Sequence, residues 1–141
     1  MIYPENFEYK LGFNKIREKL KGNALSELGQ SRVDEMRFKT HADAIRAELE
    51  QTNEFWQIQD EEENFPLEYF MDMREALERI RVEGAYMETP ELFNLLRSLK
   101  TIRAIVNFLK KKYSEDESYP ELHRLAREVT IYPFVFERIG N

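Results

Sequence analysis

The sequence predicts an all-α protein, an irregular bundle of about five to seven helices with one long helix near residues 90–112. Two observations carry this prediction. Apolar residues recur three, four and seven positions apart through most of the chain, which is the helical period. No alternating apolar and polar stretch of useful length is present, apart from a weak strand candidate at residues 130–136.

The composition is that of a globular protein with a heavily charged surface. Of the 141 residues, 42% are hydrophobic and 34% are charged, and none is cysteine, so disulfides and thiolate chemistry are excluded. No basic region followed by an apolar run begins the chain, and no apolar run could cross a bilayer, so we expect a cytoplasmic protein without membrane contact. The formal net charge of −6 argues against a free-standing nucleic-acid binder.

Three glycines interrupt the first part of the chain. We expect Gly12 to separate a first turn, Pro4–Lys10, from a short helix, and Gly22 to end that helix in the left-handed region. The second helix runs through Gly29. A glycine inside a helix costs roughly 1 kcal/mol relative to alanine, so we expect close approach of another backbone there; the alternative is a kink. The apolar stripes are Phe13, Ile16 and Leu20 in the short helix, and Leu25, Leu28, Val33 and Met36 in the second.

The third helix is expected from Thr40, as N-cap, to about Asp60, with Asp43 in its first turn. Its inward stripe is predicted as Ile45, Leu49, Thr52 and Trp56, with Phe55 beside it. An acidic connector over 60–64 follows, and Pro66 prevents continuation. A short helix then carries Tyr69, Phe70, Met73, Leu77 and Ile80, ends near Val82, and is followed by Gly84.

The long helix is the strongest local signal. Thr89 is the expected N-cap and Pro90 the first helical residue, and the helix should be about 22 residues long with Lys110, Lys111 and Lys112 in its last turn. Its apolar positions are Leu92, Leu95, Leu96, Leu99, Ile102, Val106 and Leu109.

The end of the chain is predicted to be a loop, a short helix and an apolar tail. A polar loop over 114–119 leads to a helix that Pro120 opens and that carries Leu122, Leu125 and Val129, before Tyr132 and Pro133 break it. The tail of Phe134, Phe136 and Ile139, followed at once by Gly140 and Asn141, suggests a fragment of a longer chain.

No catalytic, cofactor-binding or metal-binding residue can be assigned from the sequence. The two histidines, His41 and His123, stand in no recognisable motif and are expected at the surface, and there is no phosphate-binding loop. The acids of 60–63 lack the spacing of a calcium loop and are expected to be solvated.

Several basic side chains could contact a phosphate backbone. They are Arg97, Lys100, Arg103 and Lys110 on the long helix, and Arg79 and Arg81 before it. A solvated face paired with the abundant glutamates is the more expected alternative, so the sequence leaves any DNA-binding residues unknown. Trp56 and Phe55 could form a binding patch, but their helical spacing favours the core.

The order and spacing of these signals resemble the N-terminal region of a bacterial MutS paralogue family, the branch that lacks the mismatch-reading domain and usually carries a Smr nuclease domain. The opening helices match in Leu11, Phe13, Lys15, Ile16, Leu20, Ser26, Leu28, Gly29 and Arg32. The third helix matches in Phe38, Thr40, Ile45, Leu49, Thr52 and Glu54, the last two forming a Thr-x-Glu pattern. Later matches are Asp72, Arg74, Leu77, Arg79, Gly84, Glu91, Leu92 and Leu99. The pattern departs at Phe38, often proline in the family, and at His41, often aspartate.

The resemblance implies a large, dimeric, ATP-driven protein that binds branched DNA, restrains homologous recombination and, in some members, rescues collided ribosomes. Residues 1–141 would be the helical core and lever region. ATP and magnesium would bind in the full-length protein beyond Asn141, where the DNA-gripping clamp and nuclease would also lie, and this chain would not itself be an enzyme.

Two other interpretations stay open. The chain could be a self-contained helical adaptor for another protein, with its apolar tail over 134–139 as the docking surface. It could also be an enzyme that uses dispersed carboxylates, because paired carboxylates can run hydrolysis. However, 27 acids in a helical chain produce many accidental pairs, and no pair stands out.

Overall fold

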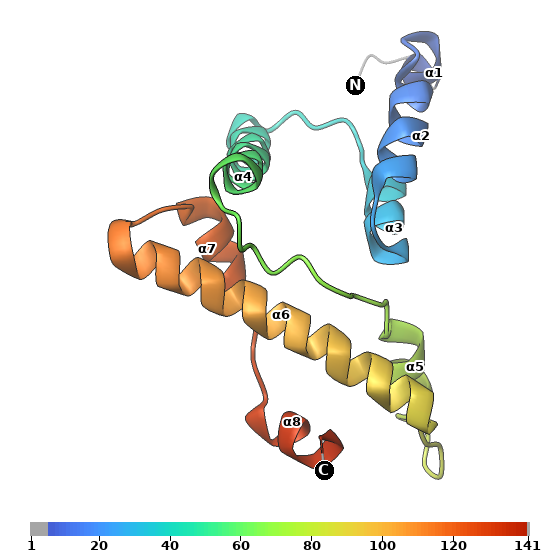
Figure 1. The fold of residues 1–141 in the computed structure, drawn as a ribbon. Helices are drawn as coiled ribbons and strands as arrows, with labels where there is room; N and C mark the ends of the chain where they lie inside the picture. Colours follow the sequence, from blue (N-terminus) through green and yellow to red (C-terminus); the bar gives the residue numbers. More distant parts are fainter. Residues whose placement is uncertain (1–5, 141) are drawn as a thin grey trace. The chain divides into compact units, whose positions relative to one another are not determined.

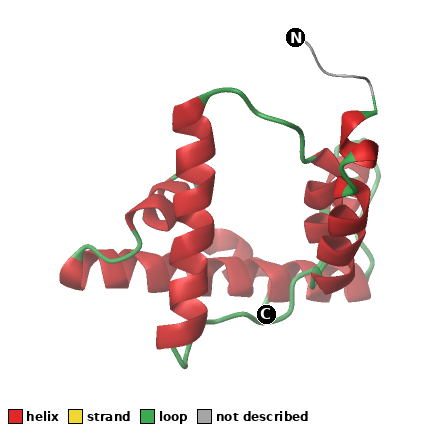
Figure 2. Cartoon of the chain, turned by 90° about the horizontal axis from the view of Figure 1, so that it is seen from above, coloured by secondary structure: helices red, strands yellow, loops and turns green. Residues whose placement is uncertain are grey.

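The computed structural model describes residues 6–140, and within them the protein forms eight helices and no strand (Figures 1 and 2). The all-α prediction is therefore confirmed. The weak strand candidate is wrong, because Pro133 opens a helix, α8 (Pro133–Ile139). The chain divides into two compact units, Met1–Phe38 and Lys39–Asn141. Of the first turn expected over Pro4–Lys10, Pro4 and Glu5 lie outside the described residues.

The first unit contains α1 (Phe7–Lys10), α2 (Phe13–Asn23) and α3 (Glu27–Glu35). Gly12 separates α1 from α2 with a φ of +75°, as predicted. The prediction for Gly22 is wrong: Gly22 lies inside α2, and the helix ends at Asn23, followed by Ala24 with an extended backbone. At the end of α2 the Ala24 amide donates a hydrogen bond to the Lys21 carbonyl (3.2 Å), and the Asn23 side chain donates one to the Lys19 carbonyl (2.8 Å). These bonds form without a left-handed residue.

The prediction of a close backbone contact at Gly29 is also wrong. Ser26 caps α3, and its hydroxyl accepts a hydrogen bond from the Gly29 amide (3.1 Å). A Cβ at Gly29 would lie 3.3 Å from the Ala24 Cβ and 3.4 Å from the Ser26 Oγ, and no backbone of another helix comes within 4 Å. Gly29 therefore faces the turn that precedes its own helix.

Arg17 joins the helices of the first unit. Its guanidinium donates hydrogen bonds to the carbonyls of Val33 (2.6 Å) and Met36 (3.1 Å), at the end of α3, and pairs with the Glu8 carboxylate (2.8 Å). Carbonyls at a helix C-terminus lack partners in the helix and favour a cation. One side chain of α2 therefore holds α1 and α3 in place.

The second unit is built around the long helix α6 (Thr89–Asp116), which contacts α7 (Pro120–Arg127) and α8, while α4 (Ala42–Glu61) contacts α7 (Figure 1). The prediction of Thr89 as N-cap is wrong: Glu88 is the N-cap, and it forms a capping box with Glu91 in the first turn. α6 has 28 residues, more than predicted, because it continues past Lys112 to Asp116. The three lysines therefore do not lie in its last turn, and the predicted loop over 114–119 is partly helical.

Two buried clusters lie along α6. One contains Ile58, Val106, Leu109, Tyr119 and Ala126; the other contains Met73, Met87 and Leu95.

The predicted inward stripe of α4 is wrong, since Leu49 is 65% exposed and Trp56 is 68% exposed. The buried side chains of α4 are Glu54 and Ile58.

The segment before α6 is largely not helical. The helix expected to include Tyr69 and Phe70 is only α5 (Arg74–Arg79), and the preceding residues run along α6 without regular structure. Two buried hydroxyls of α6 hold this segment. The Ser98 hydroxyl accepts from the Met71 amide (2.9 Å), and the Thr101 hydroxyl donates to the Tyr69 carbonyl (2.6 Å). The tertiary hydrogen bonds replace those of the predicted helix. Gly84 follows α5 with a φ of +83°, in the turn region where it was predicted.

Candidate functional site

The most distinctive polar contact joins α4 to the start of α7. The Glu54 carboxylate, 6% exposed, accepts hydrogen bonds from the backbone amides of Glu121 (3.0 Å) and Leu122 (2.8 Å). These amides are among the first of α7, whose positive dipole end favours a carboxylate. Burying a charge is costly unless hydrogen bonds compensate, and here two amides do so.

The local sequence explains why α7 needs this partner. Its N-cap residue is Tyr119, which has no side-chain acceptor in reach and adopts a left-handed backbone with a φ of 54°. Pro120, at the first helical position, has no amide to donate. The cap that sequence reasoning normally seeks next to a helix is thus supplied by Glu54, 67 residues before Glu121. The only sequence signal for it is the Thr-x-Glu pattern of α4.

A second polar group lies beside this cap. Glu62 forms an ion pair with Lys112 of α6 (2.6 Å) and accepts a hydrogen bond from the Tyr119 hydroxyl (3.2 Å). Burial, followed by the contact with Glu62, raises the pKa of Tyr119 to about 12. The hydrogen bond to Glu62 also raises the pKa of Lys112. Tyr119, predicted in a polar loop, is instead 7% exposed and part of the core.

The histidines and acids singled out in the sequence do not converge. His41 is exposed at the start of α4, whereas His123 of α7 stacks on Tyr113 of α6, with centroids 4.0 Å apart. Of the acidic run, Glu62 makes the contacts above. Within residues 6–140 the structure brings together no group of three or more histidines and acids that could hold a metal ion.

The candidate basic residues fall into two groups. The Nη2 of Arg79 donates to both carboxylate oxygens of Glu91 (2.6 and 2.7 Å), and Arg81 pairs with Glu78 (3.1 Å). Along α6, by contrast, Arg97 lies over the Tyr69 ring (4.0 Å) and Arg103 over the Phe136 ring (4.0 Å). Lys100 and Lys110 are exposed. The core position predicted for Trp56 is wrong, whereas Phe55 is half-buried against Phe65.

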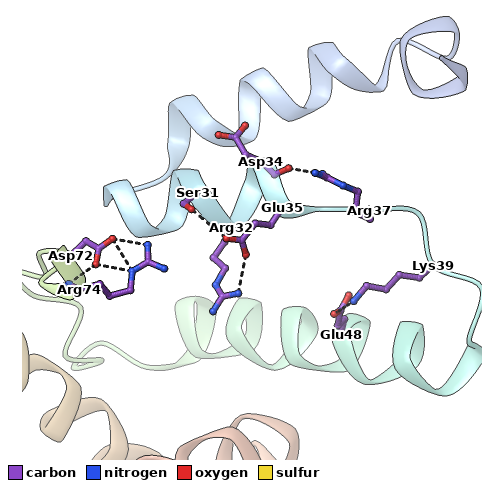
Figure 3. A network of polar contacts seen from close by, with 9 residues as sticks. All are labelled: Ser31, Arg32, Asp34, Glu35, Arg37, Lys39, Glu48, Asp72 and Arg74. Atoms are coloured by element: carbon purple, nitrogen blue, oxygen red, sulfur yellow. Dashed lines mark hydrogen bonds and ion pairs between the residues drawn. The ribbon is translucent and has the colours of Figure 1, made fainter. Parts of the chain in front are cut away.

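Other ion pairs tie together neighbouring surface positions (Figure 3). In the first unit Arg32 pairs with Glu35 (3.0 Å). In the second, Lys39 pairs with Glu48, and Arg74 with Asp72 (2.7 Å), which lowers the pKa of Asp72. Exposed pairs of this kind contribute little to stability, because water and salt screen the charges.

Taken together, these contacts define a helical packing segment in which the buried polar side chains join one helix to another. No helix among the described residues is both long and apolar enough to cross a membrane.

Comparison with known proteins places the chain in a family. It is similar to endonuclease MutS2 of Clostridium beijerinckii, with 34% identity over 116 residues, covering 82% of this chain and 14% of that protein. It is also similar to endonuclease MutS2 of Latilactobacillus sakei, with 33% identity over 134 residues, covering 93% and 16% respectively. The resemblance is confirmed: this chain is a relative of the MutS2 family.

The chain spans about one sixth of the length of the curated relatives it matches. A third relative, endonuclease MutS2 of Clostridioides difficile, is 27% identical over 131 residues, again 93% of this chain and 16% of that protein. No family model matches the chain, and no solved structure matches it.

Proposed function

We propose that residues 1–141 are a non-catalytic helical segment, the N-terminal core and lever region, of a MutS2-like ATP-dependent DNA-binding protein. The observation that carries the proposal is the 33% identity to a MutS2 protein over 93% of the chain. By the same resemblance, the parent protein would act in the cytoplasm in DNA repair, in restraint of homologous recombination and in ribosome rescue. ATP and magnesium would bind outside this segment. The partners would be the rest of the polypeptide, a second copy, branched DNA and the ribosome.

The contacts of Glu54 support a mechanical role for the segment. Because α4 caps α7, and α7 packs on α6, the three helices move as one body as long as the cap holds. The 28 residues of α6 span about 42 Å, long enough to carry a displacement between distant sites. A strut of this kind would couple nucleotide-driven movement to DNA binding in the parent protein.

The coupling is tested in the full-length protein with Glu54→Gln and, as a matched control, Glu50→Gln, an exposed acid one turn earlier on α4. The measurement is ATP hydrolysis with and without branched DNA. We expect Glu54→Gln to reduce stimulation by DNA several-fold while hydrolysis without DNA is unchanged, and Glu50→Gln to change neither. Equal stimulation in both variants would contradict the mechanical role.

The non-catalytic assignment has its own test. The purified 141-residue chain should show neither ATP hydrolysis nor DNA cleavage, whereas the longer protein should show both. Activity of the purified chain that is lost on mutating individual carboxylates would support the enzyme interpretation instead.

A self-contained interaction module remains the second candidate. The observation that favours it is the exposure of two aromatic side chains beside one another, Tyr132 (57%) and Phe134 (58%). The reading frame after Asn141 discriminates between the two. Continuation into a phosphate-binding loop supports the MutS2-like parent, and a stop codon supports the module.

A further inference from the structure

One face of α6 carries a row of basic side chains. We call the basic face the set Arg97, Lys100, Arg103, Lys110 and Lys111. No acid occurs on α6 between Glu91 and Glu115, so this part of the helix is positive in a chain whose net charge is −6. From Arg97 to Lys111 the helix rises about 21 Å.

The basic face is not neutralised by glutamates, contrary to the more expected alternative. Within residues 6–140, Arg97, Lys100, Arg103 and Lys110 form no ion pair with an acid, and Lys111 only approaches the exposed Glu115 at 3.8 Å. The basic residues before α6 behave differently, since Arg79 and Arg81 are both paired. The positive charge of the face therefore remains available to an external anion.

Two of the five side chains are held in place. The Arg97 guanidinium lies 4.0 Å from the Tyr69 ring centroid and 5.6 Å from that of Phe93, and Arg103 lies 4.0 Å from that of Phe136. Stacking uses the face of a guanidinium and leaves its N–H groups at the edge free to donate. Ordering these side chains in advance lowers the entropic cost of binding a ligand.

We propose that the basic face of α6 binds the phosphate backbone of nucleic acid, without reading its base sequence. Arg97, Lys100 and Arg103 recur every three residues, about 4.5 Å apart along the axis, and Lys110 and Lys111 follow two turns later, about 10.5 Å beyond Arg103. Repeated cations suit a ligand whose negative charges also repeat. Ala104 and Asn107, which lie among them, are small or polar and permit close approach.

Other anionic partners fit the face less well. A protein partner would need buried apolar anchors, and an anionic membrane surface would need an apolar stripe. The large aromatic side chains beside the face are engaged with its arginines: Tyr69 and Phe93 with Arg97, and Phe136 with Arg103. Of these three, Phe93 is 57% exposed. The choice of nucleic acid as the partner rests on the proposed function. The position and charge of the basic face are observed on α6 independently of that function.

The test uses the 141-residue chain and a fluorescein-labelled DNA duplex, with anisotropy measured between about 20 and about 200 mM salt. Four to five phosphate contacts predict a slope of log K against log salt near −4. Replacing Lys100 and Lys110 together by Gln should lower the magnitude of that slope by about 2, roughly 1 for each lysine. Replacing both by Arg should leave the slope unchanged, which a folding defect would not do.

The matched control replaces Lys10 and Lys15 by Gln, which removes the same charge from exposed positions of the first unit. We expect it to retain the wild-type slope. The proposal would be overturned if both double variants lost the same amount of salt dependence, or if the chain did not bind DNA at low salt. It would also be overturned if polyglutamate bound as tightly as DNA and with the same dependence on Lys100 and Lys110. If the basic face does not bind DNA, the result of the Glu54 coupling test is unaffected. If the proposed function is wrong, the reading frame after Asn141 or the assay of DNA-stimulated ATP hydrolysis shows it instead.

Discussion

The carboxylate of Glu54 in α4 lies 2.8 Å from the backbone amide nitrogen of Leu122 in α7, 68 residues later in the chain. The contact supplies hydrogen-bond partners to both groups. A buried carboxylate needs donors, and a helix that begins with Tyr119 and Pro120 needs an acceptor. Because neither need is met by a neighbouring residue, Glu54 fixes the start of α7, which also packs on α6.

Replacing Glu54 by Gln should lower the free energy of unfolding by about 1–3 kcal/mol. Gln keeps the size of the side chain but loses the charge that interacts with the helix dipole and turns one acceptor into a donor facing an amide. Glu50→Gln should change the free energy by less than about 0.5 kcal/mol, because Glu50 is exposed. Urea unfolding followed by circular dichroism measures both, and equal stabilities would refute the structural role of Glu54.

Stability should fall as the pH rises from about 10 to about 12. Since the pKa of Tyr119 is raised to about 12 in the fold, the unfolded chain releases this proton first. The stabilisation is complete below pH 10 and is lost through pH 12; the raised pKa of Lys112 acts in the same direction. Tyr119→Phe should make the pH dependence shallower, whereas Tyr86→Phe, at a residue that is 76% exposed, should not. Identical pH profiles of the two variants in thermal melts would refute this assignment.

Removing the Thr101 hydroxyl should loosen the segment that precedes α5. Thr101→Val keeps the shape of the side chain but leaves the Tyr69 carbonyl without its 2.6 Å donor, at a cost of about 1 kcal/mol. Thr52 offers a matched control, because its hydroxyl also bonds the carbonyl four residues back (2.9 Å) but is exposed and holds no other segment. In urea unfolding, a Thr52→Val effect as large as that of Thr101→Val would show that the tertiary contact contributes nothing.

The glycines of the first unit should respond in opposite directions to alanine. Gly22→Ala should stabilise α2 by about 0.5 kcal/mol, because Gly22 has helical backbone and nothing lies within 4 Å of an added Cβ. Gly12→Ala should destabilise it by about 1 kcal/mol, because Gly12 has a φ of +75°. Hydrogen exchange of the α2 amides reports both changes. If Gly22→Ala destabilised α2, that result would contradict the helical backbone at Gly22 and support the left-handed conformation predicted from the sequence.

The parts of the fold that could be predicted are those decided by nearby residues. α6 follows from apolar positions at helical spacing and from Pro90 at its start, and Gly12 follows from the break between two short helices. The same reasoning failed where distant partners decide. The apolar spacing of Tyr69 and Phe70 suits a helix, but hydroxyls of α6 bond their segment in an irregular form.

The candidate site was missed for the same reason. Apolar periodicity favours Trp56 over Glu54 as a buried residue of α4, and the structure has the opposite. Glu54 is buried because α7 presents two uncapped amides to it, and the Thr-x-Glu pattern around residue 54 does not indicate that distant partner. The basic face, in contrast, was visible in the sequence, but the absence of glutamate partners became clear only in three dimensions.

Amide hydrogen exchange at Glu121 and Leu122 tests the central claim, that Glu54 supplies the cap of α7, most directly. In wild-type protein these two amides should exchange slowly, because each is bonded to the Glu54 carboxylate. In Glu54→Gln their exchange should become at least roughly tenfold faster, while amides in the middle of α6 keep more of their protection. Unchanged protection of Glu121 and Leu122 in that variant would contradict the account.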